Sequence, residues 1–274
     1  MGTGGGPTPK ANRAASANAV VVGGRAYLVD AGNGVARQMA LAGIPFDSLA
    51  AVMITHHHSD HNIDAGALLL LAWAATLSHP IEFHGPPPLA AMLRDTLRAN
   101  RADIAVRRKD EGRVDPATLL RVHEHRQPGL VYADDRVRVT AALVEHPPMV
   151  PSFAYRFDCP DRSVVFSGDT RPSDALVELA RGADILVHEV MHLPAIEPVI
   201  ASEPNAARLR EHLLASHTSS TEVGKLASRA RVRTLVLSHF VPGGLPGVPD
   251  AEWLAAVRPD FAGEIVLGRD LMVL

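Results

Sequence analysis

Cysteine, long apolar runs and excess positive charge are scarce or missing in this chain. Cys159 is the only cysteine in 274 residues, which excludes an intramolecular disulfide and leaves the redox compartment open. The longest apolar stretch, residues 65–77, reaches about half the length that a helix needs to cross a bilayer. We therefore expect no membrane span.

The chain also lacks the positive charge that drives non-specific binding to nucleic acid. Its formal net charge is −3 with the histidines neutral. The basic run at residues 101–113 contains no aromatic residue, and acidic residues are interleaved with its arginines. A solvated surface is the expected structure for this run, and nucleic acid is not the expected partner.

The remaining composition is that of a globular protein with unusually many histidines. Apolar residues make up 47% of the chain and charged residues 21%, and 274 residues suit one large α/β domain covering residues 1–274. Residues 1–18 form a leader rich in glycine and proline. Fourteen histidines are many for this length, and a metal enzyme would account for several of them.

The most informative stretch is residues 49–61. An apolar run at residues 49–54 predicts a buried strand, and Thr-His-His-His-Ser-Asp-His follows it directly. Four histidines and one aspartate so close to a core strand are costly unless they bind something, because buried polar groups need partners. Imidazole nitrogens with a carboxylate are a ligand set that zinc prefers.

This stretch resembles the T-H-x-H-x-D-H signature of the metallo-β-lactamase fold, with His57 at the variable position and expected to point away. The resemblance implies an α/β fold, the four-layer αββα sandwich in which helices flank two mixed β-sheets. It also implies a metal-dependent hydrolase with a dinuclear metal site.

Three further ligands follow in the expected order, each after an apolar strand. His146 ends one strand, Asp169 lies in a Ser-Gly-Asp motif, and His239 lies in a Leu-Ser-His-Phe motif. The resemblance assigns one metal to His56, His58 and His146. It assigns the other metal to Asp60, His61 and His239, with Asp169 bridging the two ions. The expected ions are Zn²⁺, with Mn²⁺ and Fe²⁺ as alternatives.

Two motifs resemble the ribonuclease Z-like branch of this superfamily. Residues 184–189 end in His-Glu, and residues 216–224 resemble its His-Ser-Thr region with threonine in the middle place, which singles out Glu189 and His217. The glycine-rich residues 2–8 resemble the start of that branch, in which a hydrophobic strand comes first. We therefore expect that the first strand is truncated and that an upstream segment, even an export signal, is missing, so the compartment is undetermined.

Other polar residues receive weaker assignments. Asp30 follows a strand and is either a third-shell residue near the metals or a turn residue. Five further histidines are expected at the surface or in the second shell, namely His123, His125, His188, His192 and His212.

Elsewhere, the periodicity predicts alternating strands and helices, which is typical of an α/β fold. Expected strands cover residues 19–22, 25–29, 81–84, 150–157, 163–166, 185–187, 234–237 and 264–267, and residues 131–144 are expected to hold two strands around a turn at Asp134 and Asp135. Expected helices cover residues 35–42, 62–78, 89–100, 174–181, 221–230 and 253–257, and residues 241–250 are expected to be a loop.

The chemistry implied by the resemblance is hydrolysis by a hydroxide that bridges the two metals. Asp60 would accept a proton from the nucleophile, and His217, oriented by Glu189, would protonate the leaving oxygen. The leading interpretation is a phosphodiesterase-like enzyme acting on a small anionic phosphodiester. The resemblance also permits a homodimer.

Several alternatives stay open. The same ligand set serves hydrolysis of sulfate esters, lactones, other esters and β-lactams. Processing of the tRNA 3′ end is the activity most associated with the branch, but its members typically carry a long protruding arm, and only the modest segment 100–127 could correspond to it. From another class, a metal-binding regulatory protein with little turnover would retain the ligands.

Overall fold

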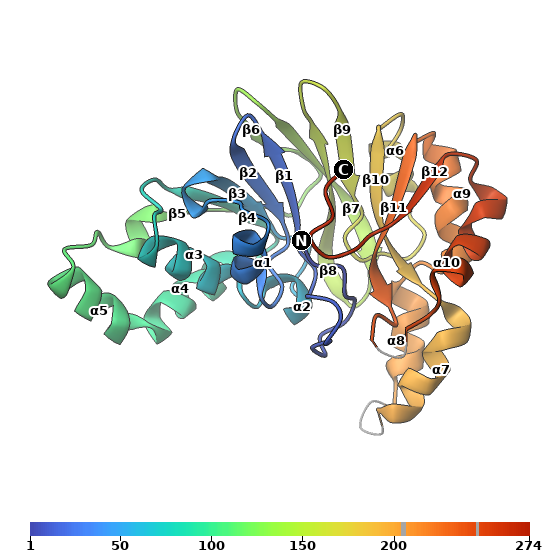
Figure 1. Ribbon diagram of the computed structural model, residues 1–274, viewed down its shortest axis with the longest axis horizontal. Coiled ribbons are helices and arrows are strands. Elements are labelled where there is room, and N and C mark those ends of the chain that lie inside the picture. The colour runs from blue at the N-terminus through green and yellow to red at the C-terminus, as the bar shows by residue number, and fades with distance from the viewer. Residues whose placement is uncertain (204–206, 245–246) are drawn as a thin grey trace.

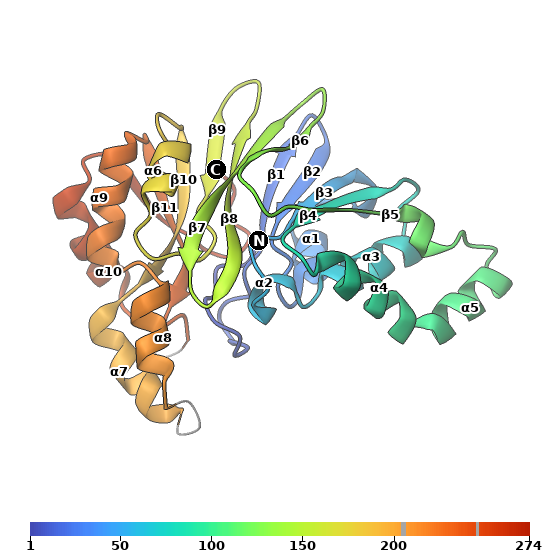
Figure 2. The same ribbon diagram turned by 180° about the vertical axis from the view of Figure 1, so that it is seen from behind.

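Two β-sheets packed face to face form the centre of the computed structural model, which describes residues 1–203, 207–244 and 247–274. Helices lie on the outer face of each sheet, which gives four layers (Figures 1 and 2). This arrangement confirms the αββα sandwich expected from the sequence. None of the helices in the described ranges is long and apolar enough to cross a membrane.

The first sheet has five strands in their order along the chain. They are β1 (Asn18–Val22), β2 (Arg25–Val29), β3 (Leu49–Met53), β4 (Ile81–Gly85) and β5 (Leu120–Glu124). β1 and β2 form an antiparallel hairpin, and β2 to β5 are parallel. Gly23 and Gly24 at the hairpin turn have φ of 53° and 84°, a combination that favours glycine and suits a two-residue turn.

The second sheet has seven strands in the order β12-β11-β10-β9-β8-β7-β6. Their bounds are β6 (Gly129–Ala133), β7 (Arg138–His146), β8 (Met149–Asp158), β9 (Ser163–Phe166), β10 (Ile185–Met191), β11 (Thr234–Val241) and β12 (Glu264–Leu267). β6 to β9 are antiparallel to one another, and β9 to β12 are parallel.

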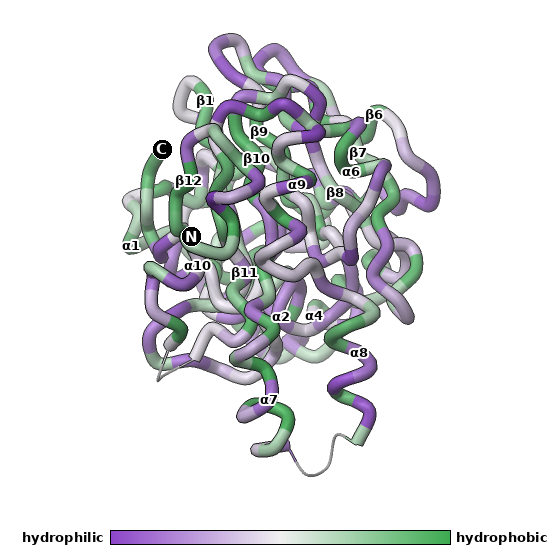
Figure 3. Tube along the Cα trace, turned by 90° about the vertical axis from the view of Figure 1, so that its right-hand side faces the viewer, coloured by the Kyte–Doolittle hydropathy of each residue, from purple (hydrophilic) through white to green (hydrophobic). Residues whose placement is uncertain are grey.

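Three hydrophobic clusters hold the layers together. One lies between the two sheets, and the hydrophobic segments in Figure 3 follow these central strands. A second joins the first sheet to α1 (Val35–Leu41), α3 (Ala65–Ala74) and α4 (Leu89–Ala99). A third joins the second sheet to α6 (Asp174–Leu179), α9 (Ser220–Ala230) and α10 (Asp250–Val257).

The remaining helices were only partly expected. The helix expected at 62–78 is shorter, α3 (Ala65–Ala74), and a separate short helix, α2 (Ser59–Asn62), precedes it. Between them, Asp64 accepts a hydrogen bond from Gly34 N at 2.6 Å and donates its own N–H to Ala31 O. α5 (Arg101–Asp110) occupies the basic run. β5, α7 (Leu193–Ser202) and α8 (Leu209–Ser216) were missed. Of the loop expected at 241–250, residues 245–246 lie outside the described residues.

The leader is packed against the rest of the chain. Thr3 is buried, and its N–H and hydroxyl both donate to Asp270 Oδ1, at 3.0 and 2.7 Å. The backbone of Gly4 forms bridges with Ala15 and with Phe240 on β11. The first residues therefore cover the end of the second sheet.

Candidate metal centre

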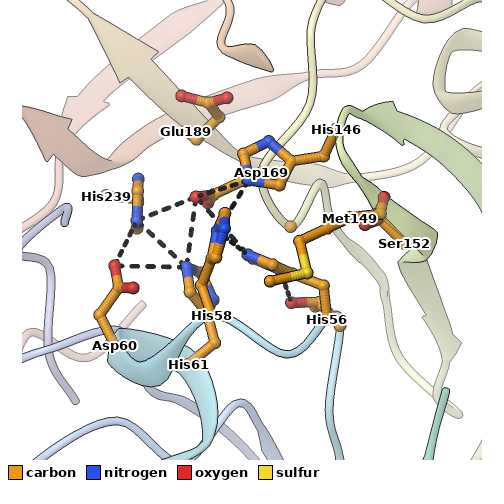
Figure 4. Close-up of polar contacts among 12 residues, drawn as sticks. His56, His58, Asp60, His61, His146, Met149, Ser152, Asp169, Glu189 and His239 are labelled. Carbon is orange, nitrogen blue, oxygen red and sulfur yellow. Dashed lines mark hydrogen bonds and ion pairs between the residues drawn. The ribbon is translucent and has the colours of Figure 1, made fainter. Parts of the chain in front are cut away.

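The predicted ligands meet where strands from both sheets end. β3 leads into His56 and His58, and α2 turns Asp60 and His61 back toward the same point (Figure 4). From the second sheet, β7 ends at His146, Asp169 follows β9, and β11 contains His239. All seven sequence-predicted ligands come together, and each except His58 is buried.

One group of donor atoms is formed by three histidines. His58 Nδ1 lies 3.1 Å from His56 Nε2 and 3.0 Å from His146 Nε2. Asp169 Oδ2 is 3.9 Å from His56 Nε2 and 4.0 Å from His146 Nε2. Tetrahedral zinc with Zn–N bonds of about 2.0–2.1 Å places its donor atoms roughly 3.3 Å apart. The group therefore fits a divalent ion.

A second group lies on the other side of Asp169. His239 Nε2 is 3.2 Å from both His61 Nε2 and Asp60 Oδ2. Asp169 Oδ2 is 3.3 Å from His61 Nε2 and 3.3 Å from His239 Nε2. A single carboxylate thus touches both groups, and the two His/Asp clusters suit a dinuclear metal site.

Backbone geometry positions two of these side chains. His239 has a φ of 44° and is the extra residue of a β-bulge, because Glu189 pairs with Ser238 and Val190 pairs with Phe240. Bulges re-aim side chains and are common beside functional sites. Gly168 has a φ of 59°, and a Cβ there would lie 2.7 Å from Phe153 O. Glycine is therefore required for the turn that presents Asp169.

Hydrogen bonds orient the imidazole rings from behind. Asp30 Oδ2 lies 2.7 Å from His61 Nδ1, and the same carboxylate accepts from Thr55 N. His146 Nδ1 lies 2.8 Å from Ser216 O. Asp30 thus contacts the proposed ligand His61 directly, so it lies nearer to the metal centre than the sequence suggested. His57 instead reaches Pro86 O at 2.8 Å and points away from both groups.

The unpaired atoms and the charge states also fit a metal. Asp169 Oδ1 is buried without a hydrogen-bond partner among the described residues. Burial, together with neighbouring imidazoles, lowers the pKa of His58 to about 4, so its lone pair is free. Burial opposes a charge on His61, but Asp169, Asp30 and Asp60 raise its pKa well above the usual value. A divalent cation would replace that proton.

A buried ion pair lies beside the two groups. His217 Nδ1 is 3.1 Å from both carboxylate oxygens of Glu189, and Oε1 also accepts from Thr170 N at 2.9 Å. Burial opposes a charge on His217, but Glu189 raises its pKa to about 9. The ring lies 5.1 Å from that of His146 between centroids. Glu189 and His217 therefore pair as the sequence suggested and face the site.

His212, which was expected at the surface or around the ligands, lies beside the site. Its half-buried ring on α8 lies 5.8 Å from the ring of His58 and 6.0 Å from that of His217. His212 lies four residues before Ser216, so the two residues share one helix face. Because Ser216 O contacts His146, this spacing was the sequence signal that His212 lies near the site. His188 is fully buried, so its expected place at the surface is wrong.

Comparison with known proteins decides the family. The sequence model of the β-lactamase superfamily domain matches residues 25–240. The chain belongs to the metallo-β-lactamase superfamily. Within it, the chain is 36% identical over 274 residues to Ribonuclease Z of Mycolicibacterium paratuberculosis, covering 99% of this chain and 95% of the relative. The ribonuclease Z-like branch is confirmed, and with it a metal-dependent hydrolase.

Solved structures support the same fold. The short form of human tRNase Z aligns with a TM-score of 0.72 at 22% identity, covering 100% of this chain and 96% of that one. The metallo-β-lactamase fold protein YhfI of Bacillus subtilis aligns with a TM-score of 0.69 at 23% identity, covering 98% and 95%. At these identities the superfamily members support the architecture alone.

Proposed function

We propose that this enzyme is a zinc-dependent endoribonuclease that removes 3′ extensions from precursor tRNA. The observation that carries the proposal is similarity along the whole length to relatives named Ribonuclease Z, at 36% identity in the first. The seven converging ligand side chains and the His217–Glu189 pair support it, since they would hold two ions and provide a proton donor.

We assign one zinc ion to His56, His58 and His146, and the other to Asp60, His61 and His239, with Asp169 between them. Zinc is favoured because most of the donors are imidazole nitrogens and the rest are carboxylates. When bound, the two ions would supply a nucleophile active near neutral pH and stabilise charge on the phosphate.

The chain's own residues would handle the protons. His217 holds a proton next to the site, and Glu189 keeps its Nδ1 occupied, which leaves Nε2 as the atom that can donate to a leaving ribose oxygen. Burial opposes a charge on Asp60, but His61 and His239 lower its pKa, so Asp60 is ionised and would accept the proton of the nucleophile. Glu189 is a positioning residue in this scheme, because it acts through His217.

The long protruding arm typical of the branch has no obvious counterpart in the sequence, but this is a weak argument against an RNA substrate. The segment that the sequence offered for an arm, residues 100–127, forms α5, a short turn and the edge strand β5 of the first sheet. The relative from Mycolicibacterium paratuberculosis is covered over 95% of its length by this chain, which leaves little room for a long segment that only the relative possesses. Length therefore does not separate this chain from proteins named Ribonuclease Z.

The small-phosphodiester interpretation remains the second candidate. It is favoured by the net charge of −3 and by the arginines of α5, where Arg107 pairs with Asp103 and Glu111, and Arg108 pairs with Asp115. Charges already paired in this way offer little attraction to a phosphate backbone.

One experiment separates the candidates. Zinc-reconstituted protein is incubated with a precursor tRNA that carries a 3′ trailer, and in parallel with bis(p-nitrophenyl) phosphate. The proposal expects trailer removal at one position, abolished in Asp169→Asn and retained in the surface control His79→Gln. Hydrolysis of the small diester with intact RNA would replace the proposal by the second candidate. No turnover of either would favour a regulatory protein.

A further inference from the structure

A second group of histidines lies on the first sheet, outside the two groups already described. His84 on β4 pairs with His123 on the adjacent parallel strand β5, and Glu82 lies two residues before His84 on the same face. The His84 ring stacks on those of His123 and His125, with centroids 4.6 and 5.4 Å apart. One donor atom from each of Glu82, His84 and His123 lies within 4.8 Å of the others.

His84 is the fixed and buried member of this group. His84 is 3% exposed, and its ring and that of Tyr132 pack edge to face with their centroids 5.5 Å apart. His84 Nδ1 lies 3.1 Å from His125 Nε2, but its Nε2 is buried and has no hydrogen-bond partner among the described residues. Buried ring nitrogens are normally paired, so this atom indicates a missing partner.

Glu82 and His123 form the accessible side of the group. Glu82 Oε2 lies 2.6 Å from His123 Nε2, while Arg121 Nε lies 3.5 Å from the other oxygen, Oε1. The side chains of Glu82 and His123 are 29% and 47% exposed, so an ion can reach them from solvent. Their exposure also lets them rotate, whereas His84 is held by its packing.

The protonation states favour a cation. Burial, then repulsion from His123 and His125, lowers the pKa of His84 to about 3. Burial, then His123, lowers the pKa of His125 as well. Both rings are therefore neutral near pH 7, so an incoming metal does not compete with a proton for the lone pair of His84, and His125 beside it adds no positive charge.

We propose that Glu82, His84 and His123 form a third metal site, which binds Zn²⁺ with His84 Nε2 as the buried ligand. Two imidazoles and one carboxylate are donors of the type that zinc selects, and a water molecule would complete four-coordination. Donor atoms that now lie within 4.8 Å would close to the roughly 3.3 Å of a tetrahedral site by movement of the exposed side chains. The ion would tie the edge strand β5 to β4, and any proton shared by His123 and Glu82 would leave to solvent.

The test is the zinc content of the full-length protein after equilibrium dialysis over a range of buffered free zinc. Mass spectrometry should find one ion fewer per chain in His123→Gln and in His84→Gln than in the wild type. Glu82→Gln should reduce the affinity of the site for that zinc ion by at least about tenfold. Loss of a direct ligand costs more than loss of a residue that only orients a ligand, which itself costs about tenfold or more. The control His79→Gln, a histidine in the loop before β4 whose ring contacts Asp47 O and Pro80 O, should bind as the wild type does.

The exposed position of His123 makes its variant the decisive one, because its folding does not depend on a buried ring. Zinc should also raise the unfolding temperature of the wild type by more than that of His123→Gln. The same difference of one ion should persist in a His58→Ala background, which makes the result independent of the catalytic centre. Equal zinc content in wild type and His123→Gln at every concentration would overturn the proposal.

Discussion

Replacement of His217 by alanine tests whether this side chain donates a proton to the leaving group. The ring is buried, and both oxygens of Glu189 lie 3.1 Å from its Nδ1. No other described imidazole contacts that carboxylate. The substitution therefore removes the proposed acid without removing a metal ligand, so the zinc content should stay that of the wild type.

The size of the effect depends on the leaving group. General acid catalysis contributes about 10²–10⁴-fold, which corresponds to roughly 3–5 kcal/mol of transition-state stabilisation. A ribose oxygen or an alkoxide is a poor leaving group and should show this full loss. p-Nitrophenolate leaves as a stable anion without protonation, so its release should fall by less than about tenfold.

The assay is kcat for a series of aryl and alkyl phosphodiesters with leaving groups of increasing pKa. The wild type should show a shallow dependence on leaving-group pKa, and His217→Ala a steep one. Glu189→Gln should change the slope in the same direction but less, since it only misorients the acid. An equal loss for all leaving groups at unchanged zinc content would refute the assignment of His217 as a proton donor.

Three further predictions concern metal and stability. Asp169→Asn should bind at least one zinc ion fewer per chain than the wild type by mass spectrometry, because Oδ2 lies 3.3 Å from His61 Nε2 in one group and 3.9 Å from His56 Nε2 in the other; an unchanged zinc content would contradict the bridging assignment. Removal of zinc by a chelator should lower the calorimetric unfolding temperature reversibly. Each site that had been held at a free zinc concentration of about 1,000 times its Kd should lose about 4 kcal/mol of unfolding free energy. An unchanged unfolding temperature would contradict tight binding. Asp134→Ala should cost about 1–3 kcal/mol in urea unfolding at pH 7, because the Tyr27 hydroxyl loses its acceptor at 2.6 Å. Burial opposes a charge on Asp134, but hydrogen bonds hold its pKa below the usual value. Its stabilising effect is therefore present above the carboxyl pKa of the unfolded chain and is lost as pH falls through the pKa of the folded protein. A difference in unfolding free energy between wild type and Asp134→Ala that grew in acid would be inconsistent with this.

The ligands could be predicted from sequence because short motifs fix them locally. Thr55 to His61 follows one buried strand, and its spacing alone brings the histidines to one end of the sheet. His146, Asp169 and His239 lie far apart along the chain, and the family motifs rather than periodicity linked them. Most strands were predicted for the same reason, since their apolar runs are continuous and buried.

What the sequence could not provide depends on tertiary contacts. β5 is an edge strand with the pattern Leu-Arg-Val-His-Glu, so its side chains are largely exposed and its hydrophobic signal is weak. The bulge at His239 and the break at Asp64 are set by neighbouring strands and loops. The stacking of His84 on His123 follows from strand register, which no single sequence reveals.

The central claim is that this dinuclear-type hydrolase acts on the 3′ end of precursor tRNA. The most direct measurement is the cleavage rate of a trailer-bearing precursor tRNA by protein confirmed to hold zinc, against the same RNA without a trailer. The account predicts a single cut that releases the trailer, no cut in the mature-length RNA, and loss of cleavage in Asp169→Asn. Hydrolysis of bis(p-nitrophenyl) phosphate by the same preparation, with the precursor left intact, would contradict it.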